Sequence, residues 1–108
     1  MKLLWENASP DSEFVPQTIP LDLSEYDGVF ILTSWGGGLA MIGNSYHCHL
    51  YDYGSSWQDL FKRSFWIHET DVEVSECARL SLNNIGAGTQ INNNLGIPLK
   101  IYGIKGVN

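Results

Sequence analysis

Two histidines separated by one residue are the first side chains in this sequence that could do chemistry. His47 and His49 stand at i and i+2, a spacing that places both rings on the same face of a β-strand. With a third ligand such as Asp52 or His68, they could hold a zinc ion. The sequence contains neither a Cys-x-x-Cys nor a His-x-x-x-His spacing, and Cys48 points to the opposite face of such a strand. We therefore predict exposed or hydrogen-bonded imidazoles, with no metal and no cofactor.

Covalent catalysis has little support in the sequence. Ser34 lies outside any Gly-x-Ser-x-Gly motif. The neighbours Cys48 and His49 would point to opposite faces of a strand, which argues against a Cys–His pair. Two pairs of carboxylates close in sequence leave a glycosidase-type pair open, namely Glu25 with Asp27 and Asp71 with Glu73. The chain is short for a hydrolase with a substrate cleft, so we predict no catalytic residue and no enzymatic activity.

Aromatic residues offer non-covalent chemistry instead. Four Trp and five Tyr are many for 108 residues, and sugar rings stack on aromatic faces while polar side chains bond their hydroxyl groups. Tyr51, Tyr53 and Trp57, around the turn at 54–56, predict an exposed aromatic platform. Six further side chains are expected to contact a ligand: His47, His49, Asn83, Asn84, Asn92 and Asn93. The other three tryptophans are expected in the core or in oligomer contacts: Trp5, Trp35 and Trp66.

The elements that must position these residues are strands. Eleven Gly, four Pro and many Thr, Ser and aromatic residues favour strands and turns over helices. Alternation of apolar and polar residues at 46–53 and at 61–69 predicts two half-buried strands. The apolar run 29–33 predicts a central strand buried on both faces, and the glycines at 36–38 predict a flexible reversal after it.

Shorter strands complete an all-β architecture. They are predicted at 2–5, 18–21 and 97–104, and Pro20 confines the second of these to a sheet edge because proline cannot donate to the ladder. About eight short antiparallel strands separated by turns predict a single domain over residues 1–108, a β-sandwich of the jelly-roll type.

Three local features depart from simple alternation. Arg63 falls on the apolar face of its strand, so we expect it near a strand end or paired with a carboxylate. An apolar set that Glu76 interrupts predicts a β-bulge or a break at that position; its members are Val72, Val74, Ala78, Leu80 and Leu82. Residues 83–96 hold five Asn and three Gly, which predicts a long functional or mobile loop.

The distribution of charge excludes two classes of partner. The net charge is −6, with eight acids and one base in residues 1–59 and four acids and five bases in residues 60–108. A basic phosphate-binding stripe is absent, so we expect no nucleic-acid binding. No apolar run approaches the roughly 18 residues of a membrane-spanning helix, so we expect no membrane insertion.

The two cysteines and the central strand bear on compartment and assembly. Cys48 and Cys77 are predicted to be buried free thiols, although pairing across neighbouring strands stays open. A strand that is apolar on both faces needs a cover for its second face. A second sheet of the same monomer and another copy of the chain are equally suitable covers.

Three stretches of the sequence resemble a known family: residues 4–10 with Phe14 and 17–19, residues 21–27 leading into 29–31, and residues 97–106. They are similar to the small proteins, and the C-terminal domains of tail proteins, that phages and prophages of Gram-positive bacteria encode near their tail genes. Residues 63–65 loosely match a basic-aromatic strand of that family, whereas relatives carry a Gly-rich centre in place of His47, Cys48 and His49. The resemblance implies association with the virion or its tail, and three-fold assembly by analogy.

These observations predict a phage or prophage tail or fibre protein, made in the cytoplasm of the bacterial host and located in the virion. It would be a homo-oligomer, with a trimer favoured, or would bind other tail proteins. Loops 43–58 and 83–96 would contact a carbohydrate of the host cell wall. Two alternatives stay open: an acidic phage-encoded inhibitor of a host defence protein, presenting carboxylates such as Asp11 and Glu13, and a small enzyme that acts on the cell wall.

Overall fold

A computed structural model describes residues 1–84, 86 and 88–106 of the chain. The described residues form nine strands, and every strand pairing is antiparallel. The strands are β1 (Lys2–Glu6), β2 (Gln17–Pro20), β3 (Gly28–Thr33), β4 (Gly36–Met41), β5 (Ser45–Tyr53), β6 (Gln58–Ile67), β7 (Asp71–Ser81), β8 (Thr89–Ile91) and β9 (Pro98–Ile104).

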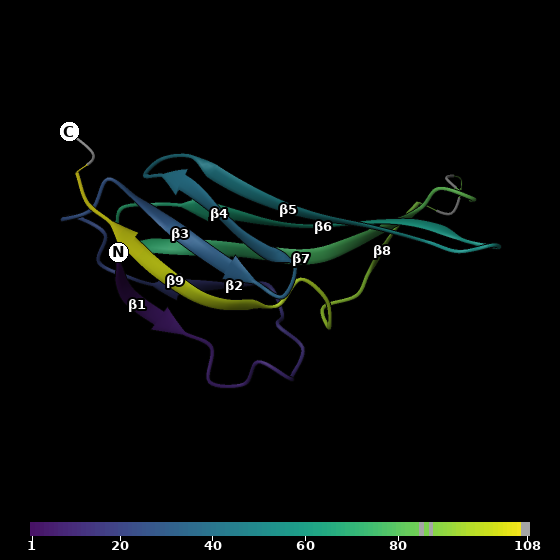
Figure 1. Cartoon of the computed structure of the whole chain (residues 1–108), viewed down its shortest axis with the longest axis horizontal. Coiled ribbons are helices and arrows are strands. Elements are labelled where there is room, and N and C mark those ends of the chain that lie inside the picture. Colours follow the sequence, from purple (N-terminus) through teal and green to yellow (C-terminus); the bar gives the residue numbers. More distant parts are fainter. Residues whose placement is uncertain (85, 87, 107–108) are drawn as a thin grey trace.

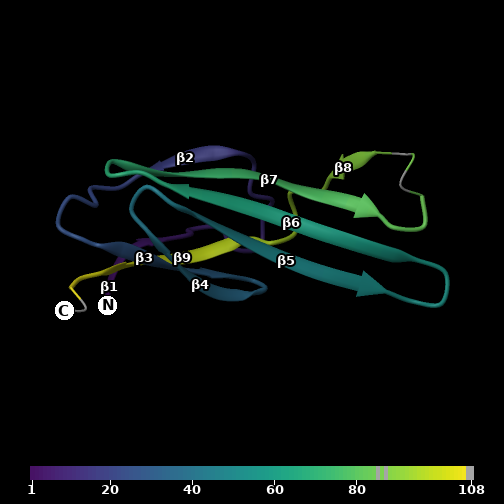
Figure 2. The same cartoon turned by 90° about the horizontal axis from the view of Figure 1, so that it is seen from above.

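The strands form two sheets that pack face to face (Figure 1 and Figure 2). The four-stranded sheet has the order β1-β9-β3-β4, and the five-stranded sheet has the order β2-β7-β6-β5, with β8 paired to β7. The chain changes sheets between β1 and β2, between β2 and β3, between β4 and β5, and before β9. This single antiparallel sandwich is the predicted fold, and β2 lies at a sheet edge as Pro20 predicts.

The core lies between the inner faces of the two sheets. Val29 and Ile31 of β3 are fully buried there, and Phe14 reaches the core from the β1–β2 connection, with its ring 6.0 Å from that of Trp5. Within one chain only one face of β3 is covered, because its alternate residues Phe30 and Leu32 are only half-buried. They lie on the outward face of the four-stranded sheet.

The reversal predicted at 36–38 lies two residues earlier. Ser34 and Trp35 make the turn between β3 and β4, and the three glycines belong to β4 itself. Gly38 is needed inside the strand because the ring of Tyr46 occupies the space of a Cβ atom, within 2.1 Å of an ideal position. Gly38 therefore lets β4 approach Tyr46 of β5 closely at the open side of the sandwich.

A buried arginine joins four segments of the chain. The Arg63 side chain is fully buried in the middle of β6. Its Nη1 donates to the carbonyls of Phe14 (2.9 Å) and Ser75 (2.7 Å), and its Nη2 donates to those of Asn93 (3.3 Å) and Leu95 (2.9 Å). The expectation of a strand end or a carboxylate partner is therefore wrong. Burial lowers the pKa of the guanidinium because removal from water disfavours its charged form.

The bulge that Glu76 predicts is present in β7. The pairing with β6 shifts between Arg63 and Phe65, so that both Ser75 and Glu76 lie opposite Ser64. The Ser75 hydroxyl accepts a hydrogen bond from the Ser64 amide (2.8 Å) and donates one to the carbonyl of Glu76 (2.7 Å). These bonds satisfy backbone groups where the ladder is interrupted.

The extra residue reverses the faces of β7 beyond the bulge. Cys77 is fully buried, whereas Ala78 and Leu80 are partly exposed on the outward side. The prediction that these two share the face of Val72 and Val74 is therefore wrong. Because side chains alternate between the two faces of a strand, one inserted residue moves every later side chain to the opposite face.

The two cysteines cannot pair in this fold. Cys48 and Cys77 flank Arg63 on the two neighbouring strands, one on each side. Their Cα atoms are thus two strand spacings apart, about 9.6 Å, beyond the roughly 7 Å limit for a disulfide. Both are buried free thiols as predicted, and burial raises the pKa of each above its ordinary value.

The segment at 83–96 is not one long loop. Residues 89–91 form β8, and the Asn92 amide donates to the carbonyl of Cys77 (2.9 Å). The Asn93 side-chain oxygen accepts from the amide of Cys77 (3.0 Å), which ties the segment to the edge of β7 beside the bulge. The predicted loop therefore consists of a turn after β7 and a segment that is hydrogen-bonded to β7 on its way back to β9. Positions 85 and 87 lie outside the described residues.

Replacing Arg63 by Ala should lower the free energy of unfolding by about 3–5 kcal/mol, because four buried or partly buried hydrogen bonds to carbonyls are lost and a cavity forms. Urea denaturation followed by tryptophan fluorescence measures the change. Lys62→Ala is the matched control, since Lys62 is adjacent and exposed; it should change stability by no more than about 0.5 kcal/mol. Equal stability of the two variants would contradict the role given to Arg63.

Candidate functional site

The five-stranded sheet extends beyond its partner as a projecting arm, formed by residues 51–60, 79–84 and 88–91 (Figure 1 and Figure 2). The sandwich ends where the ring of Trp35 packs against Phe61, with 6.1 Å between ring centroids. Beyond that contact no described strand of the four-stranded sheet covers β5, β6 or β7. The projection gives the molecule its elongated shape of 48 × 29 × 20 Å.

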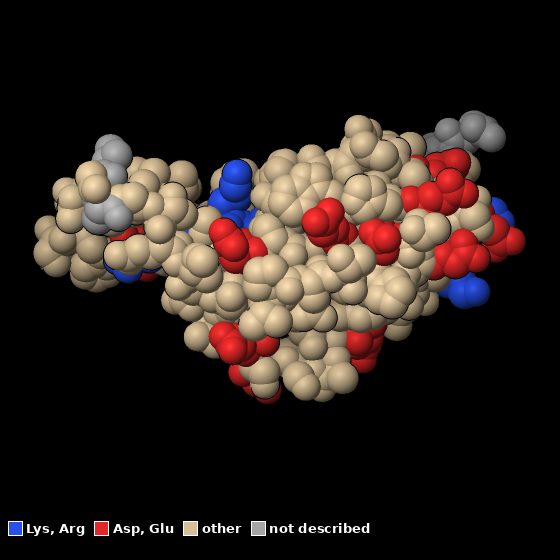
Figure 3. Space-filling model, turned by 180° about the vertical axis from the view of Figure 1, so that it is seen from behind, with Lys and Arg blue, Asp and Glu red and all other residues tan. Residues whose placement is uncertain are grey.

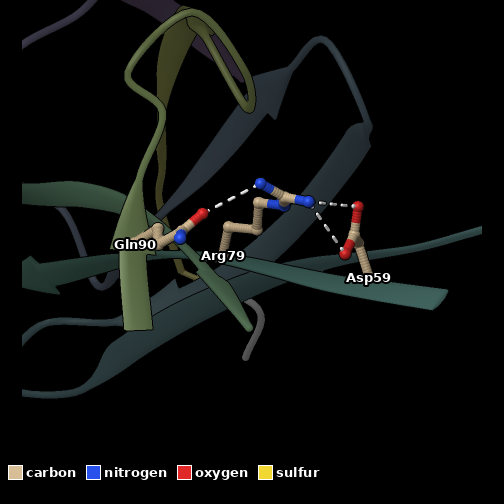
Figure 4. A network of polar contacts seen from close by, with 3 residues as sticks. All are labelled: Asp59, Arg79 and Gln90. Carbon is tan, nitrogen blue, oxygen red and sulfur yellow. Dashed lines mark hydrogen bonds and ion pairs between the residues drawn. The ribbon is translucent and has the colours of Figure 1, made fainter. Parts of the chain in front are cut away.

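The face of the arm that continues the core side is polar. Asp52, Asp59 and Ser81 form one row across the strands, and Arg79 and Gln90 belong to the next. Figure 4 shows Asp59, Arg79 and Gln90 reaching toward one another from β6, β7 and β8. Arg79 Nη2 lies 3.1 Å from one carboxylate oxygen of Asp59, and its Nη1 donates to the Gln90 side-chain oxygen at 2.9 Å.

The opposite, outward face of the arm is aromatic and aliphatic. Tyr51, Leu60, Leu80 and Thr89 lie directly opposite one another across four strands. The ring of Tyr53 lies 5.2 Å from that of Tyr51, and the two side chains are 67% and 48% exposed. Sequence reasoning identified the tyrosines but missed the two leucines. The bulge in β7 turns Leu80 outward, and Leu60 is its cross-strand partner on β6.

The outward face of the arm also differs in charge from the rest of the molecule. Its described residues, with the row at its base, include one cation and no carboxylate: His49, Tyr51, Tyr53, Gln58, Leu60, Lys62, Ala78, Leu80, Thr89 and Ile91. In Figure 3, which shows the outer surface of the five-stranded sheet, most of the visible acidic side chains lie over the body of the sandwich. The arm therefore offers a weakly basic, ring-bearing surface on an acidic protein.

The tip of the arm is a tight hairpin that fixes a tryptophan. Tyr53 and Gln58 form the last pair of β5 and β6, and the Gly54 amide donates to the carbonyl of Trp57 (2.9 Å). The indole of Trp57 lies against the Cα of Gly54, where a Cβ atom would come within 2.2 Å of the ring. The Trp57 side chain is 45% exposed, so the predicted platform of Tyr51, Tyr53 and Trp57 is placed at the end of the arm.

The two histidines lie outside the tip. His47 is on the body of the sandwich, where its Nδ1 contacts the hydroxyl of Ser64 (2.7 Å) and its Nε2 contacts that of Ser45 (3.1 Å). Both ring nitrogens are therefore engaged in hydrogen bonds. His49 is exposed at the base of the arm, in the row of Lys62.

The proposed third metal ligands are not in position. Asp52 lies on the opposite face of β5 from the two histidines, and His68 follows the far end of β6, where its Nε2 lies 3.5 Å from a carboxylate oxygen of Glu73. Within residues 1–84, 86 and 88–106, no three His, Cys, Asp or Glu side chains are grouped as a metal site would require.

The four asparagines that were predicted to contact a ligand fall into two separate groups. Asn83 and Asn84 are exposed in the turn after β7, close to the tip, because the Leu82 amide donates to the carbonyl of Gln58 (2.7 Å). Asn92 and Asn93 lie at the base of the arm. Their side-chain oxygens accept backbone hydrogen bonds there, from Asn94 (3.2 Å) and Cys77 respectively. Only the first pair can serve a ligand held at the tip.

The three tryptophans outside the arm differ in their burial. Trp5 and Trp35 are half-buried and pack against the core, as predicted. Trp66 is 39% exposed, so it does not belong to the core. It lines an open hollow of about 560 Å³ beside the β4–β5 turn, together with Leu39, Met41 and His68.

Comparisons with known proteins do not identify the chain: no family model, no curated protein and no solved structure matches it. Among the described residues, no helix has the length and apolar character needed to cross a bilayer. The arm is the feature of this molecule that most resembles a recognition surface, because its exposed rings gather where no second sheet lies.

Arg79→Ala should loosen the arm, because Asp59, whose side chain is 9% exposed, would keep its charge without a cation. We expect a local loss of about 1–2 kcal/mol, or roughly tenfold faster amide exchange in residues 58–60 and 79–81. Hydrogen exchange with mass spectrometry measures this change. Asp52→Asn, on the exposed residue opposite Asp59, should leave exchange unchanged or slow it. Faster exchange throughout the body would contradict a local role.

Proposed function

We propose that this protein is a non-catalytic attachment protein of a phage or prophage tail, whose arm contacts carbohydrate of the host cell wall. The resemblance of residues 4–10, 21–27 and 97–106 to tail-associated proteins suggests the tail. The observation that carries the binding role is the reversed polarity of the arm. Its core-side face is polar and its outward face carries rings and leucines, whereas an exposed arm that binds nothing would favour polar side chains on its outward face as well.

The arrangement of the arm suits a sugar ligand. Tyr51 and Tyr53 are neighbours on one face, and Trp57 lies at the hairpin that follows. Such rings stack on the apolar faces of sugars, and the amides of Gln58 and Asn83 are close enough to the tip to bond hydroxyl groups. The single cation and the lack of carboxylates on this described face favour a neutral or anionic polymer.

An acidic inhibitor of a host protein is the second candidate, and one observation favours it. Six of the twelve acids lie in connections between strands: Asp11, Glu13, Asp22, Glu25, Asp27 and Glu69. Exposed carboxylates on loops are suited to a basic partner. This role would use the body of the molecule and would not need the arm.

Alanine at Tyr51, Tyr53 or Trp57 should weaken binding to intact cells of the strain that encodes the protein, and to walls purified from them. We expect about 1–2 kcal/mol per ring, or a five- to thirtyfold loss of affinity. Trp66→Ala is the control, because Trp66 is also exposed but lies on the body. Unchanged binding by all three arm variants, or an equal loss with Trp66→Ala, would overturn the assignment of the arm.

The tail assignment predicts that the protein is present in purified virions at a fixed ratio to the other tail proteins. Mass spectrometry of induced, gradient-purified particles measures this ratio. Accumulation in the infected-cell lysate with absence from the particles would favour the inhibitor. Release of soluble sugar or peptide from purified walls by the protein would favour the cell-wall enzyme instead.

A further inference from the structure

The outward face of the four-stranded sheet carries an apolar row that spans all four strands. Leu3, Tyr102, Phe30 and Leu39 lie directly opposite one another on β1, β9, β3 and β4. Figure 2 shows this sheet as one outer layer of the molecule, with no described strand of the other sheet over its outward side. This is the second face of β3, which the sequence predicts to be covered.

The face is open to solvent. Leu3 is 45% exposed and Leu39 is 66% exposed, and Met41, at the end of β4, is 55% exposed. The rings of Phe30 and Tyr102 are 6.3 Å apart. Phe30 lies down over Gly37, where a Cβ atom would come within 2.3 Å of its ring. The glycine thus removes the side chain that would otherwise hold the aromatic ring away from the sheet.

The face is also nearly free of net charge, in contrast to the chain as a whole. The strands of this sheet contain three charged residues, Lys2, Glu6 and Lys100. Glu6 and Lys100 are cross-strand partners, 3.7 Å apart at their charged atoms. The molecule carries −6 overall, so its excess of acidic side chains lies outside this sheet, and two copies that meet here bring no cluster of like charges into direct contact.

We propose that a second copy of this chain packs on the outward face of the four-stranded sheet and forms a two-fold symmetric dimer. A face that meets the same face of a second copy makes an isologous contact, which closes at two subunits. The two sheets would stack at about 10 Å with strands crossing at about 30°, as in the core of a sandwich. The inference depends on the fold alone and stands apart from the proposed function.

The size of the face sets the strength of the dimer. Four strands about 4.8 Å apart and six residues of about 3.4 Å each give a footprint of about 400 Å² per copy. Stable interfaces bury about 800 Å² per partner. The dimer is therefore at the weak, transient end of the range of specific interfaces.

Sedimentation equilibrium of the full chain between roughly 5 µM and 1 mM, concentrations that reach the range in which a weak dimer forms, tests the proposal. The average mass should rise from 12.1 kDa toward twice that value, and 1 M NaCl should preserve the association because apolar contact drives it. A mass that stays at one chain throughout this range would overturn the dimer. A mass of three chains would overturn it as well, because three-fold assembly requires a head-to-tail contact.

Leu39→Glu should weaken the association at least tenfold, because it places a carboxylate in the apolar row. Leu39 lies on an edge strand and is mostly exposed, so the variant should fold, which its circular dichroism and urea midpoint would verify. Ile91→Glu is the matched control: it introduces the same charge at a site 60% exposed on the arm. Loss of the dimer in Ile91→Glu with retention in Leu39→Glu would assign the contact to the arm and overturn the proposal.

Discussion

The buried guanidinium of Arg63 is the interaction on which the rest of this structure depends. Its donors bind carbonyls from the β1–β2 connection, from the bulge of β7 and from the return before β9, segments that are far apart in sequence. By bonding the carbonyl of Ser75, it stabilises β7 in its bulged register. The bulge then places Arg79 on the core side and Leu80 on the solvent side, which gives the arm its two faces.

Much of the fold follows from local patterns, because a period of two identifies which side of a strand is buried. The alternation in β5 and β6 predicts the inward positions of Cys48 and Phe65 correctly, and Glu76 predicts the position of the bulge. The faces beyond the bulge could not be predicted, since one extra residue reverses them without leaving a mark in the downstream sequence. The carbonyl partners of Arg63 are equally hidden, because backbone groups carry no sequence signal.

The candidate site could be predicted only in part for the same reason. The rings at Tyr51, Tyr53 and Trp57 follow from the alternation of β5 and the glycine turn. The composition of 83–96 suggests one loop, but Asn93 is fixed beside Cys77 by contacts that only the tertiary structure reveals. A signal for the arm was present: Asp52 and Asp59 occupy positions that continue the apolar side of their strands, where carboxylates indicate that the sandwich has ended.

The continuity of β6 and β7 from the arm into the body has a mechanical consequence. The bonds of an antiparallel ladder run perpendicular to the strands. A force that pulls on the hairpin tip along the long axis therefore loads many of these bonds in shear, rather than breaking them one after another. Sliding of β6 past β7 would also pull Arg63 away from the four carbonyls that it binds. The paired register of these two strands should therefore resist unfolding by a force along this axis.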